Sequence, residues 1–115
     1  MNLPLLGALG EIALVSVIVG SWARYATRFG RARRLVAEGK ATLLDVDLLP
    51  EYRKSHIEGA VHIPLDELEA RLGELGGTDK VVVVYGRGGM RAARASRVLR
   101  AHGYRVIDLG HVHAF

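Results

Sequence analysis

The stretch from Lys80 to Leu109, KVVVVYGRGGMRAARASRVLRAHGYRVIDL, decides the fold class. It opens with Lys80–Tyr85, a β-branched run that is typical of a strand buried on both faces of a parallel sheet. A glycine-rich turn follows, and the pattern then predicts a helix over about Met90–His102 that Gly103 closes. A last strand is expected over Arg105–Leu109. This strand–helix–strand order predicts an α/β unit, because parallel strands need a crossover connection of this kind.

Upstream of this stretch, short apolar runs alternate with helical patterns in the same way. The predicted elements are a helix that ends at Gly39, a strand over Ala41–Val46, a short helix over Leu49–Ser55, a strand over Ala60–Ile63 and a helix over about Asp66–Leu75. Leucines at helical spacing mark one face of the last helix, at Leu65, Leu68, Leu72 and Leu75. Together these patterns predict the α/β class with a central, mainly parallel sheet.

The N-terminal part of the chain has the composition of a membrane anchor. Leu3–Ala23 carries one charged side chain, Glu11, and has about the ~20 residues that a helix needs to cross a bilayer. Residues 24–40 follow with six basic residues against one acid, a formal charge of +5. Because the bases follow the apolar run, the positive-inside rule predicts a single-pass protein of the inner membrane, with its N-terminus outside and its domain in the cytoplasm.

Two alternatives to a spanning helix remain open: a cleaved signal peptide, which lacks its usual basic start here, and a helix that lies in the membrane interface. Glu11 also has two interpretations. It can bond a partner helix beside Ser16 and Gly20, or it can point to the headgroups from a shallow helix. The predicted domains are residues 1–23 as the anchor, 24–40 as a basic juxtamembrane segment with the first helix, and 41–115 as the globular domain.

Charge and cysteine usage exclude several function classes. Residues 41–115 contain ten basic and ten acidic side chains, and a neutral domain is a poor partner for nucleic acid. The chain has no cysteine, so disulfides, thiolate metal sites and a cysteine nucleophile are excluded. His111 and His113 flank Val112, but no cluster of further ligands completes a metal site. No metal and no cofactor is therefore predicted.

The segment GRGGMR, from Gly86 to Arg91, lies where an open α/β sheet binds its ligands, beyond the carboxyl end of a strand. Consecutive amides of a glycine-rich loop and the following helix N-terminus form an anion site, and Arg91 can add a guanidinium. The alternative is a plain structural turn. The predicted anion-binding residues are Gly86, Arg87, Gly88, Gly89, Met90 and Arg91.

From about Arg31 to Phe115 the chain resembles the rhodanese-like (sulfurtransferase) domain. The resemblance is carried by LLDVDLLPEYRKSHIEGAVHIPLDELEARL at residues 43–72 and by VVVVYGRGGMRAARASRVLRAHGYRVIDLGHVHAF at residues 81–115. It implies a three-layer domain around a central, mainly parallel sheet. Asp45 and His56 match the family pattern, and we expect them to support the loop as framework residues rather than to act as catalytic groups.

Departures from the family pattern decide the expected function. Gly86 stands where the family has the cysteine that carries the persulfide sulfur, Asp47 stands where it usually has arginine, and Ser55 where it usually has glycine. Because sulfur transfer requires a thiolate, no catalytic residue is predicted. We expect a membrane-anchored binding or scaffold module, with membrane lipid at residues 3–23, an unknown protein partner and a small anion at the loop.

Two other functions stay open at this point. One is a sulfurtransferase that works with a thiol supplied by a partner. The other makes the N-terminal helix the functional part, through helix association, with the domain as a passive handle.

Overall fold

The computed structural model describes the backbone of residues 3–112 and of residue 115, and the side chains from residue 14 onward except that of Tyr25. The chain divides into two compact units, Met1–Gly30 and Arg31–Phe115. The second unit coincides with the part of the chain on which the family resemblance rests.

One helix, α1 (Leu3–Ala37), includes both the predicted anchor and the first predicted helix. No proline interrupts the residues between them, so the helix continues to the predicted stop. There Gly39 has a φ of +70°, and its amide bonds the Val36 carbonyl at 3.1 Å. This left-handed glycine ends the helix as expected.

None of the described helices is both long enough and apolar enough to cross a membrane. The side chains of residues 3–13, including Glu11, lie outside the described residues. The two interpretations of Glu11 therefore stay predictions.

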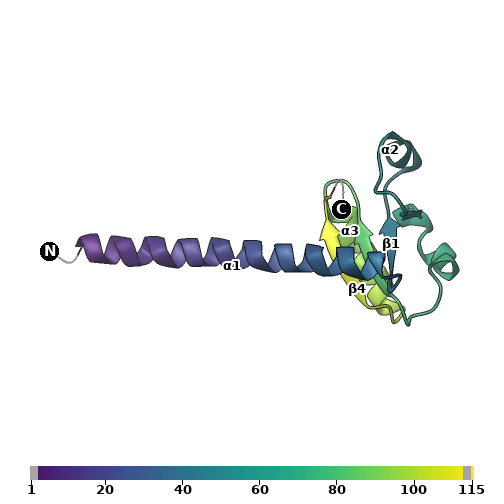
Figure 1. The fold of residues 1–115 in the computed structure, drawn as a ribbon. Coiled ribbons are helices and arrows are strands. Elements are labelled where there is room, and N and C mark those ends of the chain that lie inside the picture. The colour runs from purple at the N-terminus through teal and green to yellow at the C-terminus, as the bar shows by residue number, and fades with distance from the viewer. Residues whose placement is uncertain (1–2, 113–114) are drawn as a thin grey trace. The chain divides into compact units, whose positions relative to one another are not determined.

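The second unit is built on a four-stranded sheet of β1 (Ala41–Asp45), β2 (Val61–His62), β3 (Val81–Tyr85) and β4 (Val106–Gly110) (Figure 1). The strand order is β2-β1-β3-β4, and every neighbouring pair is parallel. The predicted central parallel sheet is confirmed. Strand β3 lies between β1 and β4 and is buried along its whole length, which explains its unbroken β-branched sequence.

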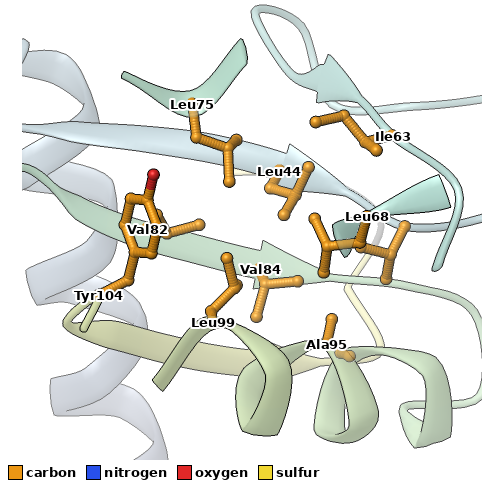
Figure 2. Packing of buried hydrophobic residues seen from close by; sticks show 11 residues of the cluster. Leu44, Ile63, Leu68, Leu75, Val82, Val84, Ala95, Leu99 and Tyr104 are labelled. Carbon is orange, nitrogen blue, oxygen red and sulfur yellow. The ribbon is translucent and has the colours of Figure 1, made fainter. Parts of the chain in front are cut away.

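The main core lies between one face of this sheet and helix α3 (Met90–Ala101). Figure 2 shows Ala95 and Leu99 of α3 facing Val84 of β3, all with no more than a trace of exposure. The remaining buried residues of this core are Leu44, Val46, Ile63, Leu68, Leu75, Val82, Ala92 and Tyr104. The Tyr104 hydroxyl also donates to the Gly76 carbonyl at 2.8 Å. This packing holds β3 and α3 rigidly on both sides of the loop that joins them.

The predicted α-helix over Asp66–Leu75 is wrong in type. The structure has two 3₁₀ segments instead, η1 (Leu65–Glu67) and η2 (Glu69–Leu75), with non-helical angles at Arg71 (φ −117°, ψ 17°). The leucines at 65 and 68, and those at 72 and 75, are three residues apart, which matches the three residues per turn of a 3₁₀-helix. The change of conformation at Arg71 lies between these two pairs.

Candidate functional site

The candidate site lies at the carboxyl ends of β1 and β3. Asp45 and Tyr85, the last residues of these parallel strands, are paired in the sheet register. The chain continues from Asp45 to Asp47 on one side and from Tyr85 into Gly86–Arg91 on the other. The sheet register therefore places Asp47 beside the predicted anion loop.

Consecutive backbone amides of the loop are already hydrogen-bonded within the chain. Gly88 and Gly89 have φ values of +75° and +79°, which favour glycine at both positions and turn the backbone back toward α3. The amide donors and their acceptors are Gly86 to the Gly110 carbonyl (3.0 Å), Arg87 to Asp47 Oδ1 (2.7 Å), Gly88 to His111 Nδ1 (3.1 Å) and Gly89 to the Gly86 carbonyl (3.4 Å). Of these four acceptors, the Asp47 carboxylate is the one that carries a negative charge.

Asp47 is the acid that the loop holds. Its side chain is only 3% exposed, and Oδ1 accepts both the Arg87 amide and Arg91 Nη1, the latter at 3.1 Å. Its other oxygen, Oδ2, lies 3.9 Å from Arg87 Nε. The Asp47 carbonyl lies 2.6 Å from His62 Nε2, which fixes the backbone of the same residue. The loop thus fixes the side chain of Asp47, and His62 fixes its backbone.

A second acid, Glu51, stands on helix α2 (Leu49–Lys54) and completes the pairing of the arginines. Glu51 Oε1 accepts the Leu48 amide at 2.9 Å and Arg91 Nη1 at 2.5 Å. The hydrogen bond from Leu48 is the largest cause of a lowered pKa of the Glu51 carboxyl, and Arg91 and Arg87 lower it further. In the same way Glu51, followed by Asp47, raises the pKa of the Arg91 guanidinium. The pair is ionised at neutral pH.

The Arg87 guanidinium also bonds to its own domain. Its Nη2 donates to Ser55 Oγ at 3.0 Å and lies 3.3 Å from the Glu51 carbonyl. Ser55, noted in the sequence only as a departure from the family pattern, is therefore a partner of a loop residue. The two loop arginines are balanced by the two carboxylates of Asp47 and Glu51.

Gly86 is buried, and the space that its missing side chain leaves is narrow. A Cβ added there would lie 3.1 Å from Asp47 Oδ1, 3.2 Å from Val46 Cγ2 and 3.7 Å from Arg91 Cβ. The first two distances are shorter than ordinary van der Waals contacts. Asp47 and Val46 thus crowd the position at which the family pattern has its nucleophile.

The two supporting residues differ in their surroundings. Asp45 is fully buried, and its Oδ1 accepts the Asp47 amide at 2.8 Å, so it holds the turn that presents Asp47. Within the described residues its Oδ2 is a buried oxygen without a hydrogen-bond partner. His56 is exposed and stacks on Tyr52, with ring centroids 3.8 Å apart, while Tyr52 also stacks on His62 at 4.3 Å. His56 therefore belongs to an aromatic stack beside the loop.

Tyr85 joins the end of β3 to the segment after α2. Its buried hydroxyl accepts the Ile57 amide at 2.9 Å. Burial is the largest cause of a raised pKa of this phenol, and the nearby Asp45 and Asp47 carboxylates raise it further, since they disfavour a third negative charge.

The space enclosed beside the loop is very small. The pocket lined by Asp47, Ser55, His56, Ile57, Tyr85, Arg87 and Val112 has a volume of ≈ 10 Å³. That is about the volume that one water molecule needs. The side chain of Met90, another residue of the predicted anion site, is 68% exposed.

The sequence identified Asp47 only as a departure from the family pattern and gave no site role to Asp47, Glu51, Ser55 or His111. The signal for Asp47 was its position two residues beyond the end of a strand that pairs with β3. Within the described residues no three His, Asp or Glu side chains are grouped to hold a metal. His113 lies outside those residues.

Comparison with known proteins gives consistent results for this unit. The rhodanese-like domain family matches residues 30–111. The chain is 33% identical over 75 residues to the Bacillus subtilis protein named "Putative sulfur carrier protein YrkF", which covers 65% of this chain and 40% of that protein. It is 40% identical over 101 residues to the HTH-type transcriptional regulator Rv0324 of Mycobacterium tuberculosis, covering 85% of this chain and 44% of that one. The chain thus spans less than half the length of either relative.

Among solved structures, the human single-domain sulfurtransferase TSTD1 is similar with a TM-score of 0.59 and 28% identity. The likeness covers 71% of this chain and 87% of that one.

Proposed function

Because the chain belongs to the rhodanese-like domain family, we propose that it is a membrane-anchored binding or scaffold module of that family that does not transfer sulfur. One observation carries the proposal. The buried residue after β3, where the family pattern has the sulfur-carrying cysteine, is Gly86, and the chain contains no cysteine at all. No side chain here can form the persulfide on which rhodanese-type transfer depends.

Exposed apolar side chains beside the loop support a protein partner. Leu48 and Leu49, which follow Asp47 in the chain, are 50% and 44% exposed, and Met90 of the loop is 68% exposed. Leu48 and Leu65 also line a shallow pocket together with Arg91. Exposed apolar patches of this kind mark interaction surfaces when they are contiguous, and we propose that these residues form one.

A partner that docks there is tested by affinity capture of the full chain from detergent-solubilised membranes. Leu48→Asp together with Met90→Asp should remove a partner that the wild-type chain retains. Arg94→Asp, an exposed position on α3, is the matched control and should retain it. A partner that both variants retain would contradict docking at this surface.

Exposed apolar residues on α1 support the membrane anchor. The described side chains of Leu14, Val15, Val17, Ile18, Val19 and Trp22 are between 57% and 67% exposed on this helix. Six basic residues follow over positions 24–40, the arrangement that retains a helix with its basic flank in the cytoplasm. The proposal therefore places the N-terminus outside the inner membrane and the domain in the cytoplasm.

Carbonate extraction of bacterial membranes tests the anchor with the full chain. We expect the chain to stay in the membrane pellet and a variant that lacks residues 1–23 to leave it. A tag at the C-terminus should be cleaved by protease in inside-out vesicles and protected in intact spheroplasts. Recovery of the full chain in the soluble fraction would contradict anchoring.

The absence of sulfur transfer is tested by thiocyanate formation from thiosulfate and cyanide with the purified full chain. The expected rate is that of the blank without protein. The alternative, a sulfurtransferase that borrows a thiol, predicts that added glutathione raises the rate above a blank containing the same glutathione. Any rate that the chain adds to its matched blank would contradict the proposal.

A further inference from the structure

We propose that the Asp47 carboxylate is the resident anion of the Gly86–Arg91 loop, and that the loop is consequently closed to free anions in the wild-type chain. In this arrangement the chain itself supplies the anion that the sequence predicted from solution. The proposal concerns the loop alone, so it stands or fails independently of membrane anchoring and of sulfur transfer.

The contacts of Asp47 are those of a bound anion. Its Oδ1 accepts a backbone amide at 2.7 Å and a guanidinium nitrogen at 3.1 Å, and the carboxylate is almost completely buried. Short, charge-assisted hydrogen bonds from a turn amide and an arginine are how glycine-rich loops bind carboxylate and phosphate groups. Asp47 is tethered to the end of β1, so it binds without the entropy loss of a free ligand.

The loop has few donors left for a second anion. The amides of four consecutive residues from Gly86 to Gly89 each have an acceptor in the chain. Arg87 is engaged by Ser55 and by the Glu51 carbonyl, and Arg91 by Asp47 and Glu51. The pocket of ≈ 10 Å³ beside the loop has room for about one water molecule.

The charges at the loop balance. Two guanidinium groups, Arg87 and Arg91, face two carboxylates, Asp47 and Glu51, within hydrogen-bond or ion-pair distance. A free anion therefore meets no excess of positive charge. Removal of the Asp47 carboxylate would leave these four groups with one positive charge in excess. It would also leave the Arg87 amide without its acceptor and Arg91 with Glu51 as its carboxylate partner.

Gly86 and Asp47 form a complementary pair in this arrangement. A side chain at position 86 would press on the carboxylate, since a Cβ there would lie 3.1 Å from Oδ1, which is closer than ordinary van der Waals contact. The absence of a side chain at position 86 thus leaves room for the acid at position 47.

Sulfate is a suitable probe, because its charge and tetrahedral shape fit a loop of this kind. We would titrate the full chain in detergent micelles with sodium sulfate at constant ionic strength and follow the amide resonances of Arg87, Gly88 and Met90. Asp47→Ala should show saturable shifts, and the wild-type chain should show none over the same range of sulfate concentration. This corresponds to a dissociation constant for sulfate at least about tenfold lower in the variant. Glu69→Gln, which removes one negative charge at an exposed position, is the matched control and should behave as wild type.

Saturable shifts in Asp47→Ala but not in the wild type would support the proposal. Equal saturation in both, or saturation in neither, would overturn it. If the alanine variant does not give a folded spectrum, Asp47→Ser is used in its place. A second measurement needs no variant: crystals of the wild type grown from ammonium sulfate should show Asp47 on the Arg87 amide, and a sulfate in its place would overturn the proposal.

Discussion

Asp47 Oδ1 lies 3.1 Å from the point that a Cβ on Gly86 would occupy. A side chain at position 86 would therefore be in steric conflict with the Asp47 carboxylate. In addition, a carboxylate so close to a thiol disfavours the thiolate form that sulfur transfer requires. Restoring the family's cysteine is thus a change that the present site opposes in two ways.

The first prediction is that Gly86→Cys alone gives no sulfur transfer. Overpacking against Asp47 and Val46 should lower the free energy of unfolding by about 1–3 kcal/mol. Combining it with Asp47→Ala should relieve part of this loss and give measurable thiocyanate formation from thiosulfate and cyanide. Arg94→Cys controls for a thiol elsewhere on the surface. A single variant as active as the double variant would show that Asp47 does not block the position.

The second prediction concerns the Arg91 side chain, which bonds both acids of the site. Arg91→Ala removes the guanidinium hydrogen bond to the buried Asp47 carboxylate and leaves Arg87 as its ion-pair partner, so it should lower the free energy of unfolding by about 2 kcal/mol, measured by urea denaturation. Arg91→Lys should cost less, because it keeps the charge but not the planar group. Arg94→Ala, exposed on the same helix, should be close to neutral. An equal loss for the two alanine variants would contradict a specific role.

The third prediction follows from Tyr85, whose phenol pKa is raised above its ordinary value chiefly by burial. A phenol that resists ionisation in the folded state contributes stability fully below its unfolded pKa of about 10, and this contribution is lost as the pH rises above that value. The free energy of unfolding should therefore fall more steeply above about pH 10 in the wild type than in Tyr85→Phe. Urea denaturation at several alkaline pH values measures this difference, and parallel curves would contradict it.

The sheet was predictable because its signals are local. A β-branched run such as Val81–Tyr85, followed by glycines and an amphipathic helix, is typical of a buried parallel strand in an α/β fold. The segment Asp66–Leu75 was not, because leucine spacings of three and four residues fit an α-helix as well as two 3₁₀ turns. Only the packing of Leu68 and Leu75 against the core decides between them.

The position of the loop was predictable, but its occupant was not. Gly86–Arg91 follows the best strand signal in the chain, so its place at the sheet edge follows from α/β topology. The identity of the bound anion depends on the register that pairs Asp45 with Tyr85, and sequence alone does not give that register. Asp47 was therefore noticed as a change of charge, without its contact to the Arg87 amide.

The fourth prediction concerns Glu51, whose pKa is lowered first by the Leu48 amide and then by Arg91 and Arg87. A carboxyl with a lowered folded pKa contributes stability that is present above its unfolded pKa of about 4.3 and is lost as the pH falls through the folded value. Glu51→Gln should therefore be less stable than the wild type at neutral pH, and the difference should shrink as the pH falls below about 4.

Urea denaturation of the wild type and Glu51→Gln at a series of acidic pH values measures this difference. Glu58→Gln, an exposed change of the same type, is the control and should follow the wild type at every pH. Since Glu51 also accepts the Leu48 amide, the glutamine oxygen can keep that hydrogen bond while losing the charge that pairs with Arg91. A stability difference that stays constant with pH would contradict a stabilising role for the charge of Glu51.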